Sequence, residues 1–350
     1  MSAGGGTSRT PTLGTVAQAA GVSVQTVSNV LNAPHKVGAD TLARVEAEIA
    51  SQGYRPNRDA RSLRTRRSCL LGYCWAHPTG TANALLERFI HAVTQSAERR
   101  DHHVLLFTEA GDVHHPMSVY RSLVAQHAVD GFVISDTTVG DERLEWLSRH
   151  DVPFAAFGRR WAAPEIGSWV DVDGAAGVAA AVDHVVGLGH RRLAYLGWPA
   201  GSGVGDDRAR GFVEAAGVHG VSADVMTRTD GGLDEGRRAA AELLDLADPP
   251  TAFVCVSDDL ALGCDQAVRE RGLLAGRDVA ITGFDDSTAV GLPGVAITSV
   301  RQPVDEVGEH VVRLLLDRLA DRLAEPEQIL LTPSLVVRAS TDHPDRHSGH

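Results

Sequence analysis

The stretch TLGTVAQAAGVSVQTVSNVLN, residues 12–32, decides the fold of the N-terminal part of the chain. Apolar residues recur three and four positions apart on either side of Gly21, which is the pattern of two short amphipathic helices. Glycine ends the first helix because it adopts positive φ without steric cost, and Ser23 is a favourable N-cap for the second. The residues predicted to point inward are Val16, Ala17, Ala20, Val27, Val30 and Leu31.

The outer face of the second helix carries short, uncharged polar side chains: Gln25, Thr26, Ser28, Asn29 and Asn32. A third helix is predicted over residues 39–52 and ends at Gly53. Two helices joined by a three-residue turn form a helix-turn-helix, whose second helix enters the major groove of DNA. Hydroxyls and amides there read base edges or contact phosphates. An ordinary amphipathic helix on a globular protein is the alternative.

Charge is unevenly distributed along the 350 residues. The formal net charge is −12, yet residues 1–68 hold nine basic and four acidic residues. That segment therefore carries +5, which leaves −17 for residues 69–350. A basic head on an acidic body favours a polyanion such as DNA at the head and repels it elsewhere. A solvated basic tail is the alternative that charge alone leaves open.

The segment YRPNRDARSLRTRRS, residues 54–68, has too few large apolar residues to form a stable helix alone. Pro56 and Asn57 can begin a helical turn, after which Ala60 and Leu63 share a face between arginines. Two such segments side by side would bury these faces against each other and insert the leucine into the minor groove as a wedge. A flexible basic linker fits the residues equally well.

From residue 69 onward, apolar β-like runs alternate with amphipathic helical stretches. The runs are CLLGYCW, HVLLF, DGFVIS and PFAAF and, after a predicted crossing near Trp169–Asp173, RLAYLGW, VMTRT, AFVCVS and DVAITGF. Near-continuous apolar strands alternating with helices indicate parallel sheets covered on both faces. Two such series predict two doubly wound α/β lobes, with a ligand crevice at the carboxyl ends of the strands.

These patterns predict a division of the chain into five parts. They are a disordered tail at 1–11, the helix-turn-helix domain at 12–54, a hinge helix or linker at 55–68, a two-lobed core at 69–340 and a disordered tail at 341–350. Lobe 1 is predicted to comprise about 69–171 plus 299–327, and lobe 2 about 172–298 plus 328–340. A helix at 303–323 and a last strand at 328–337 are expected to pack back across the lobes.

Composition argues against several protein classes. Hydrophobic content of 43% with 22% charged residues is ordinary for a globular protein. No apolar run reaches the ~18 residues that span a bilayer, and the first residues lack the apolar part of a secretory signal. We therefore expect no membrane span, a cytoplasmic location and four free thiols, since no C-x-x-C spacing is present.

Motifs for cofactors and metals are weak. The sequence has no H-E-x-x-H and no Walker A loop, and GSGVG at 201–205 differs from G-x-G-x-x-G. Paired histidines such as His102–His103 fit solvated surface better than a metal site. No cofactor and no metal are therefore predicted.

Six stretches, taken in order, resemble the lactose-repressor (LacI/GalR) family of bacterial transcription regulators. They are TLGTVAQAAGVSVQTVSNVLN, KVGADTLARVEAEIASQGYRPNRDARSL, GDDRARGF, SDDLALG, ITGFDDS and TSVRQP. The resemblance covers roughly residues 12–340 and implies a DNA-binding headpiece, a hinge helix that folds on operator DNA and a core similar to periplasmic sugar-binding proteins. It also implies a homodimer, or a tetramer, on a near-palindromic operator. We expect a repressor of carbohydrate-utilisation genes that a small sugar controls.

The resemblance assigns roles within the DNA-binding part. Val24, Gln25 and Asn29 match positions that contact bases in the major groove. Positions that hold phosphates or orient the helix are matched by Ser23, Thr26, Ser28, Asn32 and Lys36. The hinge is matched by Asn57, Ala60 and Leu63, the last as the intercalating wedge. Many members carry arginine where this chain has Asn29; arginine pairs with guanine, whereas asparagine prefers adenine or a water-mediated contact, so the half-site sequence stays open.

The resemblance also points to an effector pocket in the core. Arg208 matches the arginine that anchors the effector, while Asp258 and Asp285 match acidic positions facing the cleft. Ser257 stands where the family commonly has asparagine. A guanidinium and a carboxylate at strand ends hold vicinal sugar hydroxyls with charge-assisted hydrogen bonds. An ion pair with a neighbouring aspartate is the alternative for Arg208, and helix capping is the alternative for Asp258 and Asp285.

Two tryptophans follow predicted strands at equivalent places. Trp75 ends the first strand and Trp198 follows RLAYLG, so both are expected at the mouth of the crevice. Indole faces stack on sugar rings there, which favours a di- or oligosaccharide. Packing beneath a loop is the alternative for each.

Two other function classes share this core. An exported solute-binding protein would have the same two lobes but needs a signal segment. A sugar- or nucleotide-modifying enzyme would use Asp258 or Asp285 as a general base. Because the sequence shows neither a nucleophile–base pair nor a cofactor loop, we expect a regulator that is not an enzyme.

Overall fold

The structure of the protein is a computed structural model that describes residues 11–54, 67–75, 82–108, 117–161 and 167–341. The chain divides into two units, Met1–Ser68 and Cys69–His350. The predicted hinge residues Asn57, Ala60 and Leu63 lie outside the described residues, and so do most of the two predicted tails.

The described part of the first unit consists of three α-helices and a short 3-10 helix. They are α1 (Leu13–Ala20), α2 (Val24–Asn32), η1 (Pro34–Lys36) and α3 (Ala39–Gln52). Gly21 and Gly53 follow α1 and α3 with φ of 64° and 61°, the left-handed conformation in which glycine ends a helix. The predicted helix-turn-helix is therefore confirmed.

A small apolar core holds these helices together. The Ser23 hydroxyl accepts a hydrogen bond from the backbone N–H of Thr26 at 3.0 Å, which begins α2. The inner faces of the helices then pack on one another, with Leu31 partly buried at their margin. The buried members are Val16, Ala17, Ala20, Val27, Val30, Val45 and Tyr54.

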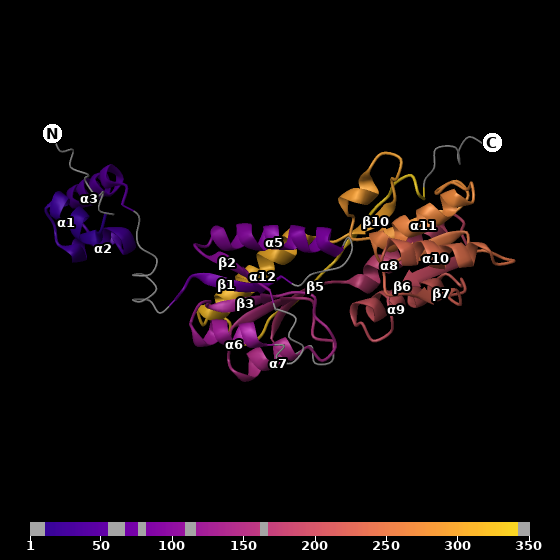
Figure 1. Cartoon of the computed structure of the whole chain (residues 1–350), viewed down its shortest axis with the longest axis horizontal. Coiled ribbons are helices and arrows are strands. Elements are labelled where there is room, and N and C mark those ends of the chain that lie inside the picture. The colour runs from indigo at the N-terminus through magenta and orange to yellow at the C-terminus, as the bar shows by residue number, and fades with distance from the viewer. Residues whose placement is uncertain (1–10, 55–66, 76–81, 109–116, 162–166, 342–350) are drawn as a thin grey trace, which may run out of the picture. The chain divides into compact units, whose positions relative to one another are not determined.

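The second unit contains two lobes, each built on one sheet (Figure 1). The first sheet has the strand order β11-β5-β4-β3-β1-β2, and all neighbouring strands are parallel. Its strands are β1 (Leu70–Cys74), β2 (His103–Phe107), β3 (Gly131–Ile134), β4 (Phe154–Phe157), β5 (Ser168–Val172) and β11 (Gln328–Leu331). One face is covered by α5 (Ala82–Glu98) and α12 (Val304–Leu319), and the other by α6 (Ser118–Ala125) and α7 (Glu142–Arg149).

The second sheet has the order β12-β10-β9-β8-β6-β7, in which only the β10–β12 pair is antiparallel among the described strands. Its strands are β6 (Leu193–Gly197), β7 (Met226–Arg228), β8 (Ala252–Cys255), β9 (Ala280–Phe284), β10 (Thr298–Arg301) and β12 (Ser334–Val336). The helices are α8 (Gly174–Gly187), α9 (Val204–Val218), α10 (Leu233–Leu244), α11 (Asp258–Glu270) and η2 (Thr288–Gly291). Helix α8 packs on α9 and α10 on α11. The predicted pair of doubly wound lobes is confirmed.

Within residues 167–341 the chain passes between the lobes three times, and the details differ from the prediction. The segment near Trp169–Asp173, predicted as a crossing, is strand β5 of the first sheet. The predicted last strand at 328–337 is two strands, because β11 pairs with β5 whereas β12 pairs with β10. Pro333 stands between them, and proline lacks the N–H that a continuous ladder requires.

The predicted division of the core is therefore corrected in three places. Residues 298–301, mostly assigned to lobe 1, form β10 of the second sheet, and residues 328–331, assigned to lobe 2, form β11 of the first. Thr341, assigned to a disordered tail, is fully buried, with its hydroxyl 2.7 Å from that of Thr298. Apolar periodicity identifies a strand but not the sheet that it joins, because strand pairing is a long-range contact.

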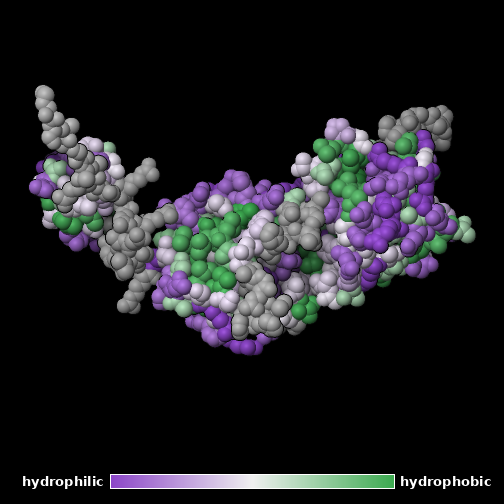
Figure 2. Space-filling model, viewed as in Figure 1, coloured by the Kyte–Doolittle hydropathy of each residue, from purple (hydrophilic) through white to green (hydrophobic). Residues whose placement is uncertain are grey.

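The surface of the second unit is mixed. In Figure 2, hydrophobic residues gather over the part of the first lobe where β1 and β2 lie, whereas hydrophilic residues cover much of the second lobe. Strand β2 is the edge of the first sheet, and its Leu106 is 54% exposed. In the part of the chain that the structure describes, no helix has the length and apolar character of a membrane span.

Candidate functional site

The outer face of α2 is the candidate DNA-reading surface. Val24, at the start of α2, is 50% exposed, whereas Val27, about one turn further along, is fully buried. The side-chain amide of Gln25 donates through Nε2 to Oδ1 of Asn29 at 3.1 Å. The two amides therefore act as one pair, which retains a donor on Asn29 (Nδ2) and an acceptor on Gln25 (Oε1).

Residues predicted to contact phosphate lie along the same helix and beyond its end. The hydroxyls of Ser23 and Thr26 are 2.9 Å apart at the first turn. Ser28 is partly buried within α2, Asn32 is its last residue, and Lys36 is exposed in η1. The phosphate contacts themselves stay predictions.

A cavity of about 960 Å³ lies between the two lobes of the second unit. The first lobe contributes α5, the segments after β3 and β4, and the end of β5. The second lobe contributes the segments after β6, β7, β8 and β9. Of the predicted effector residues, Trp198, Arg208, Ser257 and Asp285 line this cavity. Its walls are thus the carboxyl ends of parallel strands, where α/β proteins bind ligands.

Arg208, on α9, is only 5% exposed. Its Nη1 donates to the Val256 carbonyl at 2.5 Å, and its Nη2 lies 3.9 Å from Oδ1 of Asp285. The guanidinium carbon is 3.6 Å from the Phe284 ring centroid and 5.1 Å from that of Trp198. Its buried Nε has no hydrogen-bond partner among the described residues. The guanidinium therefore places a buried positive charge in the wall of the cavity.

Asp285 holds a carboxyl group beside this guanidinium. Its backbone φ is 106°, which is rare for a residue other than glycine. Gln302 donates through Nε2 to Oδ1 of Asp285 at 2.6 Å. Burial raises the pKa of Asp285 to about 6, although Arg208 opposes the shift. Backbone strain that the surroundings maintain is typical of functional positions, and the ionised carboxylate here can accept hydroxyl hydrogen bonds.

Asp258 and Ser257 make contacts inside the second lobe. The Asp258 carboxylate is nearly fully buried and accepts from the Ser287 backbone N–H and the Ser299 hydroxyl, both at 2.6 Å. Burial, followed by the charge of Asp285, raises the pKa of Asp258 to about 7. The hydroxyl of Ser257 is the N-cap of α11. Asp258 therefore ties the start of α11 to the neighbouring segments, and capping belongs to Ser257.

Two tryptophans line the cavity, but they are not the predicted pair. Trp198 does so from the second lobe, together with Trp161 from the segment after β4 of the first lobe. Buried Nε1 of Trp161 has no hydrogen-bond partner within the described ranges. Gly203 lies so close to the Trp161 indole that a Cβ at position 203 would be 2.4 Å from the Cδ1 atom of Trp161. Trp75 instead packs on the first-lobe core, edge-on to Tyr73.

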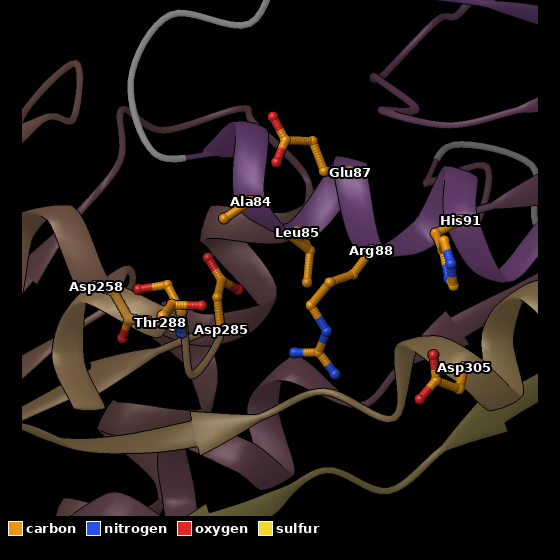
Figure 3. A pocket seen from close by; sticks show the side chains of 10 residues that line it. Ala84, Leu85, Glu87, Arg88, His91, Asp258, Asp285, Thr288 and Asp305 are labelled. Atoms are coloured by element: carbon orange, nitrogen blue, oxygen red, sulfur yellow. Dashed lines mark hydrogen bonds between the residues drawn. The ribbon is translucent and has the colours of Figure 1, made fainter. Parts of the chain in front are cut away.

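A smaller cavity of about 440 Å³ adjoins the first, since Leu85 and Asp285 line both. Figure 3 shows Arg88 extending from α5 into the space between that helix and the segment that carries Asp285 and Thr288. Asp258 lines this smaller cavity, not the large one.

The sequence did not single out several residues of the large cavity. Asp171 and Asp207 line it from opposite lobes and share a partner, Arg159, which is not part of the lining. Arg159 Nε donates to Asp171 at 2.6 Å, and its Nη2 lies 3.6 Å from Asp207. Burial raises the pKa of Asp171 against the effect of Arg159. Gln302 also lines the cavity. The place of Gln302 and Asp207 within the motifs TSVRQP and GDDRARGF could have identified them from the sequence. Trp161 carried the same kind of signal as Trp198, because it also follows a predicted apolar strand, PFAAF.

Acidic side chains dominate the lining of the large cavity. Arg208 is the basic residue among those described there, and the acidic ones are Asp136, Asp171, Asp207, Asp230, Glu235, Asp259 and Asp285. Carboxylates accept hydrogen bonds from hydroxyls and repel anions. The lining therefore suits a neutral, hydroxyl-rich molecule better than a phosphate or carboxylate.

Two family models match parts of the chain. The model of bacterial regulatory proteins of the lacI family matches residues 12–57, and that of the periplasmic binding protein-like domain matches residues 182–341. The HTH-type transcriptional regulator CelR of Thermobifida fusca is 33% identical over 340 residues, which cover 95% of this chain and 98% of that protein.

Two solved structures extend the likeness over most of the chain. A CelR–cellobiose complex is 30% identical with a TM-score of 0.71, covering 94% of this chain and 99% of that one. The Lac repressor dimer bound to operator and the anti-inducer ONPF is 26% identical with a TM-score of 0.80, covering 95% and 100%. Sequence identity of this extent shows that the chain belongs to the LacI family of bacterial regulatory proteins, which are helix-turn-helix transcriptional regulators.

Proposed function

We propose that this regulator represses carbohydrate-utilisation genes and that a neutral sugar, bound between the two lobes, controls its affinity for operator DNA. The observation that carries the proposal is the large cavity, in which Arg208 is surrounded by carboxylates at the carboxyl ends of the strands. Family membership supports the DNA-binding half of the proposal, and the chemistry of the cavity supports the ligand half.

The hydrogen-bonded amides of α2 support a preference for adenine. In the major groove adenine presents an acceptor at N7 and a donor at N6. Nδ2 of Asn29 is a donor and Oε1 of Gln25 is an acceptor, and the bond between the two side chains holds them in one orientation. This donor and acceptor match adenine, and a good bidentate contact discriminates by about 1–3 kcal/mol.

Three features of the cavity support a sugar as the ligand. The carboxylates accept hydrogen bonds from hydroxyls, while Nε of Arg208 and Nε1 of Trp161 are buried donors without a partner in the described chain. The indole faces of Trp161 and Trp198 supply apolar surface for a pyranose ring. The excess of acidic groups disfavours sugar phosphates and nucleotides.

Cavity size supports a ligand of more than one ring. About 960 Å³ lies at the upper end of the ~300–1,000 Å³ usual for ligand sites. Two tryptophans on opposite lobes provide one stacking surface on each side. The solved CelR complex contains cellobiose, a disaccharide, in a related protein. A di- or oligosaccharide is therefore the proposed ligand class.

A homodimer on a near-palindromic operator completes the proposal. The exposed Leu106 on edge strand β2 lies in a lobe whose surface is hydrophobic over β1 and β2 (Figure 2). Exposed apolar patches and open sheet edges mark association surfaces. Two copies related by a twofold axis would present two α2 helices to two half-sites, as helix-turn-helix dimers do.

The test combines a ligand screen with DNA binding. Neutral mono-, di- and oligosaccharides are screened for a rise in melting temperature, with their phosphorylated forms as matched controls. Hits are then added to the full chain on fluorescent DNA from upstream of its own gene. We expect a disaccharide to raise the melting temperature and change the anisotropy-derived Kd by at least tenfold.

Two results would overturn the proposal. A phosphorylated sugar that binds better than its neutral form would contradict the ligand class. Binding to the upstream DNA that is no tighter than binding to random competitor DNA would contradict operator recognition. Chromatography of the incubated sugar distinguishes a further class, since conversion of the hit into product would identify a sugar-modifying enzyme.

A further inference from the structure

Three residues far apart in the sequence meet at the amino-terminal edge of the first sheet. Cys69 precedes β1, His102 precedes β2 and Asp130 precedes β3. Because Leu70 pairs with His103, Cys69 lies beside His102, and because Leu71 pairs with Gly131, Asp130 lies beside Leu70, the next residue along β1. Their thiol, ring-nitrogen and carboxylate ligand atoms all lie within 4.8 Å of one another. The large cavity lies at the carboxyl ends of the strands, so this cluster is separate from it.

Local contacts orient two of the three side chains. The carboxylate of Asp130 accepts through Oδ2 from the backbone N–H of Cys69 at 2.8 Å. Nδ1 of His102 lies 2.7 Å from the carbonyl oxygen of Arg100. A carbonyl only accepts, so Nδ1 carries the proton of the neutral ring and Nε2 keeps a lone pair. Metal-bound imidazoles are held in the same way, with the other ring nitrogen donating to a carbonyl or carboxylate.

We propose that Cys69, His102 and Asp130 bind a divalent transition-metal ion of the zinc class, with water at the fourth position. Thiolate and imidazole select Zn²⁺ or Co²⁺ over Mg²⁺ and Ca²⁺, which require oxygen ligands. Ligand atoms around tetrahedral zinc lie about 3.5 Å apart. Side-chain rotations that move these atoms by about 1 Å therefore bring all three within bonding distance of one ion. On binding, the Cys69 thiol releases its proton to solvent and the sulfur forms the bond to the metal.

The position of the site gives the ion a structural consequence. Cys69 is the first residue of the second unit and directly follows the segment that leads from the DNA-binding unit. Its backbone φ is 55°, a conformation that residues with a Cβ seldom adopt. A bound ion ties this residue to the starts of β2 and β3. It therefore stabilises the beginning of β1, and the stabilisation grows with the logarithm of the free metal concentration once that exceeds the Kd.

Cobalt titration tests the proposal directly. The full chain is stripped of metal with a chelator, kept reduced and titrated with Co²⁺ while thiolate-to-cobalt charge-transfer absorbance is recorded. We expect one Co²⁺ per chain with this band, and loss of the band when Zn²⁺ displaces the cobalt. Histidines elsewhere on the chain cannot produce the band, because it requires a thiolate ligand.

Matched variants assign the ligands. Cys69→Ser is expected to abolish the band, and His102→Asn and Asp130→Asn to weaken Co²⁺ binding at least about tenfold. Cys74→Ser, at the other end of β1, and His103→Asn, next to His102, change residues of the same types and are expected to keep both band and affinity. Circular dichroism verifies that each variant is folded. If Cys69→Ser does not fold, the weaker Co²⁺ binding expected of His102→Asn tests the site in its place. Absence of the band in the wild-type chain, its persistence in folded Cys69→Ser or its loss in folded Cys74→Ser would overturn the site.

Discussion

Replacing Arg208 with methionine separates the ligand role of this side chain from its structural role. The side chain is 5% exposed, stacks 3.6 Å from the Phe284 ring centroid and keeps its Nε without a partner in the described chain. A hydrogen bond from a charged donor to a ligand contributes about 1.5–3 kcal/mol. Since about 1.4 kcal/mol corresponds to a tenfold change in Kd, Arg208→Met is expected to weaken sugar binding about 10- to 150-fold.

Stability is expected to change less than ligand affinity. Methionine retains the apolar contact with Phe284 but removes the hydrogen bond to the Val256 carbonyl, which costs about 1–3 kcal/mol if that oxygen stays unpaired. Removal of a buried charge offsets part of this cost, because burial already disfavours the charged guanidinium and lowers the pKa of Arg208. The variant should therefore fold, with a melting temperature lowered by only a few degrees.

Isothermal titration with the sugar found in the screen measures the Kd, and fluorescence anisotropy measures operator affinity without sugar. Arg269→Met is the matched control, because Arg269 is 48% exposed on α11 and bonds to Asp265 and the Gly294 carbonyl, away from both cavities. Both variants should bind operator like the wild type. Sugar binding by folded Arg208→Met with the wild-type Kd would refute the assignment of the cavity.

Three further predictions concern the two sites and the hinge. Asn29→Arg should shift the preferred base from adenine towards guanine in a binding-site selection, because arginine pairs bidentately with O6 and N7 of guanine; an unchanged consensus would contradict base reading by α2. With a pKa of about 6, Asp285 should make sugar affinity fall about tenfold between pH 8 and pH 5, since the accepting carboxylate is lost as pH falls through that pKa; Asp285→Asn, measured by the same titration, should flatten the profile. Leu63→Ala, at the predicted wedge outside the described residues, should weaken operator binding in a gel shift and leave sugar binding intact; equal operator affinity would remove the wedge.

Much of this architecture follows from local patterns in the sequence. Helical periodicity, Gly21, Ser23 and Gly53 placed α1, α2 and α3 to within a residue or two, because caps and amphipathic faces depend on neighbours in the chain. The alternation of apolar strands and helices likewise identified two α/β lobes. The resemblance to a family then placed Arg208 and Asp285, both of which line the large cavity.

Other features depended on contacts between distant segments, which periodicity does not encode. The sheet that each of β5, β10 and β11 joins is decided by pairing across the lobes, so the predicted division of the core was wrong there. Trp161, not Trp75, reaches the cavity because the loop after β4 turns towards α9 whereas Trp75 packs on its own lobe. The cluster of Cys69, His102 and Asp130 exists only because parallel strands bring their starting ends to one edge. Long-range packing therefore selects which side chains meet.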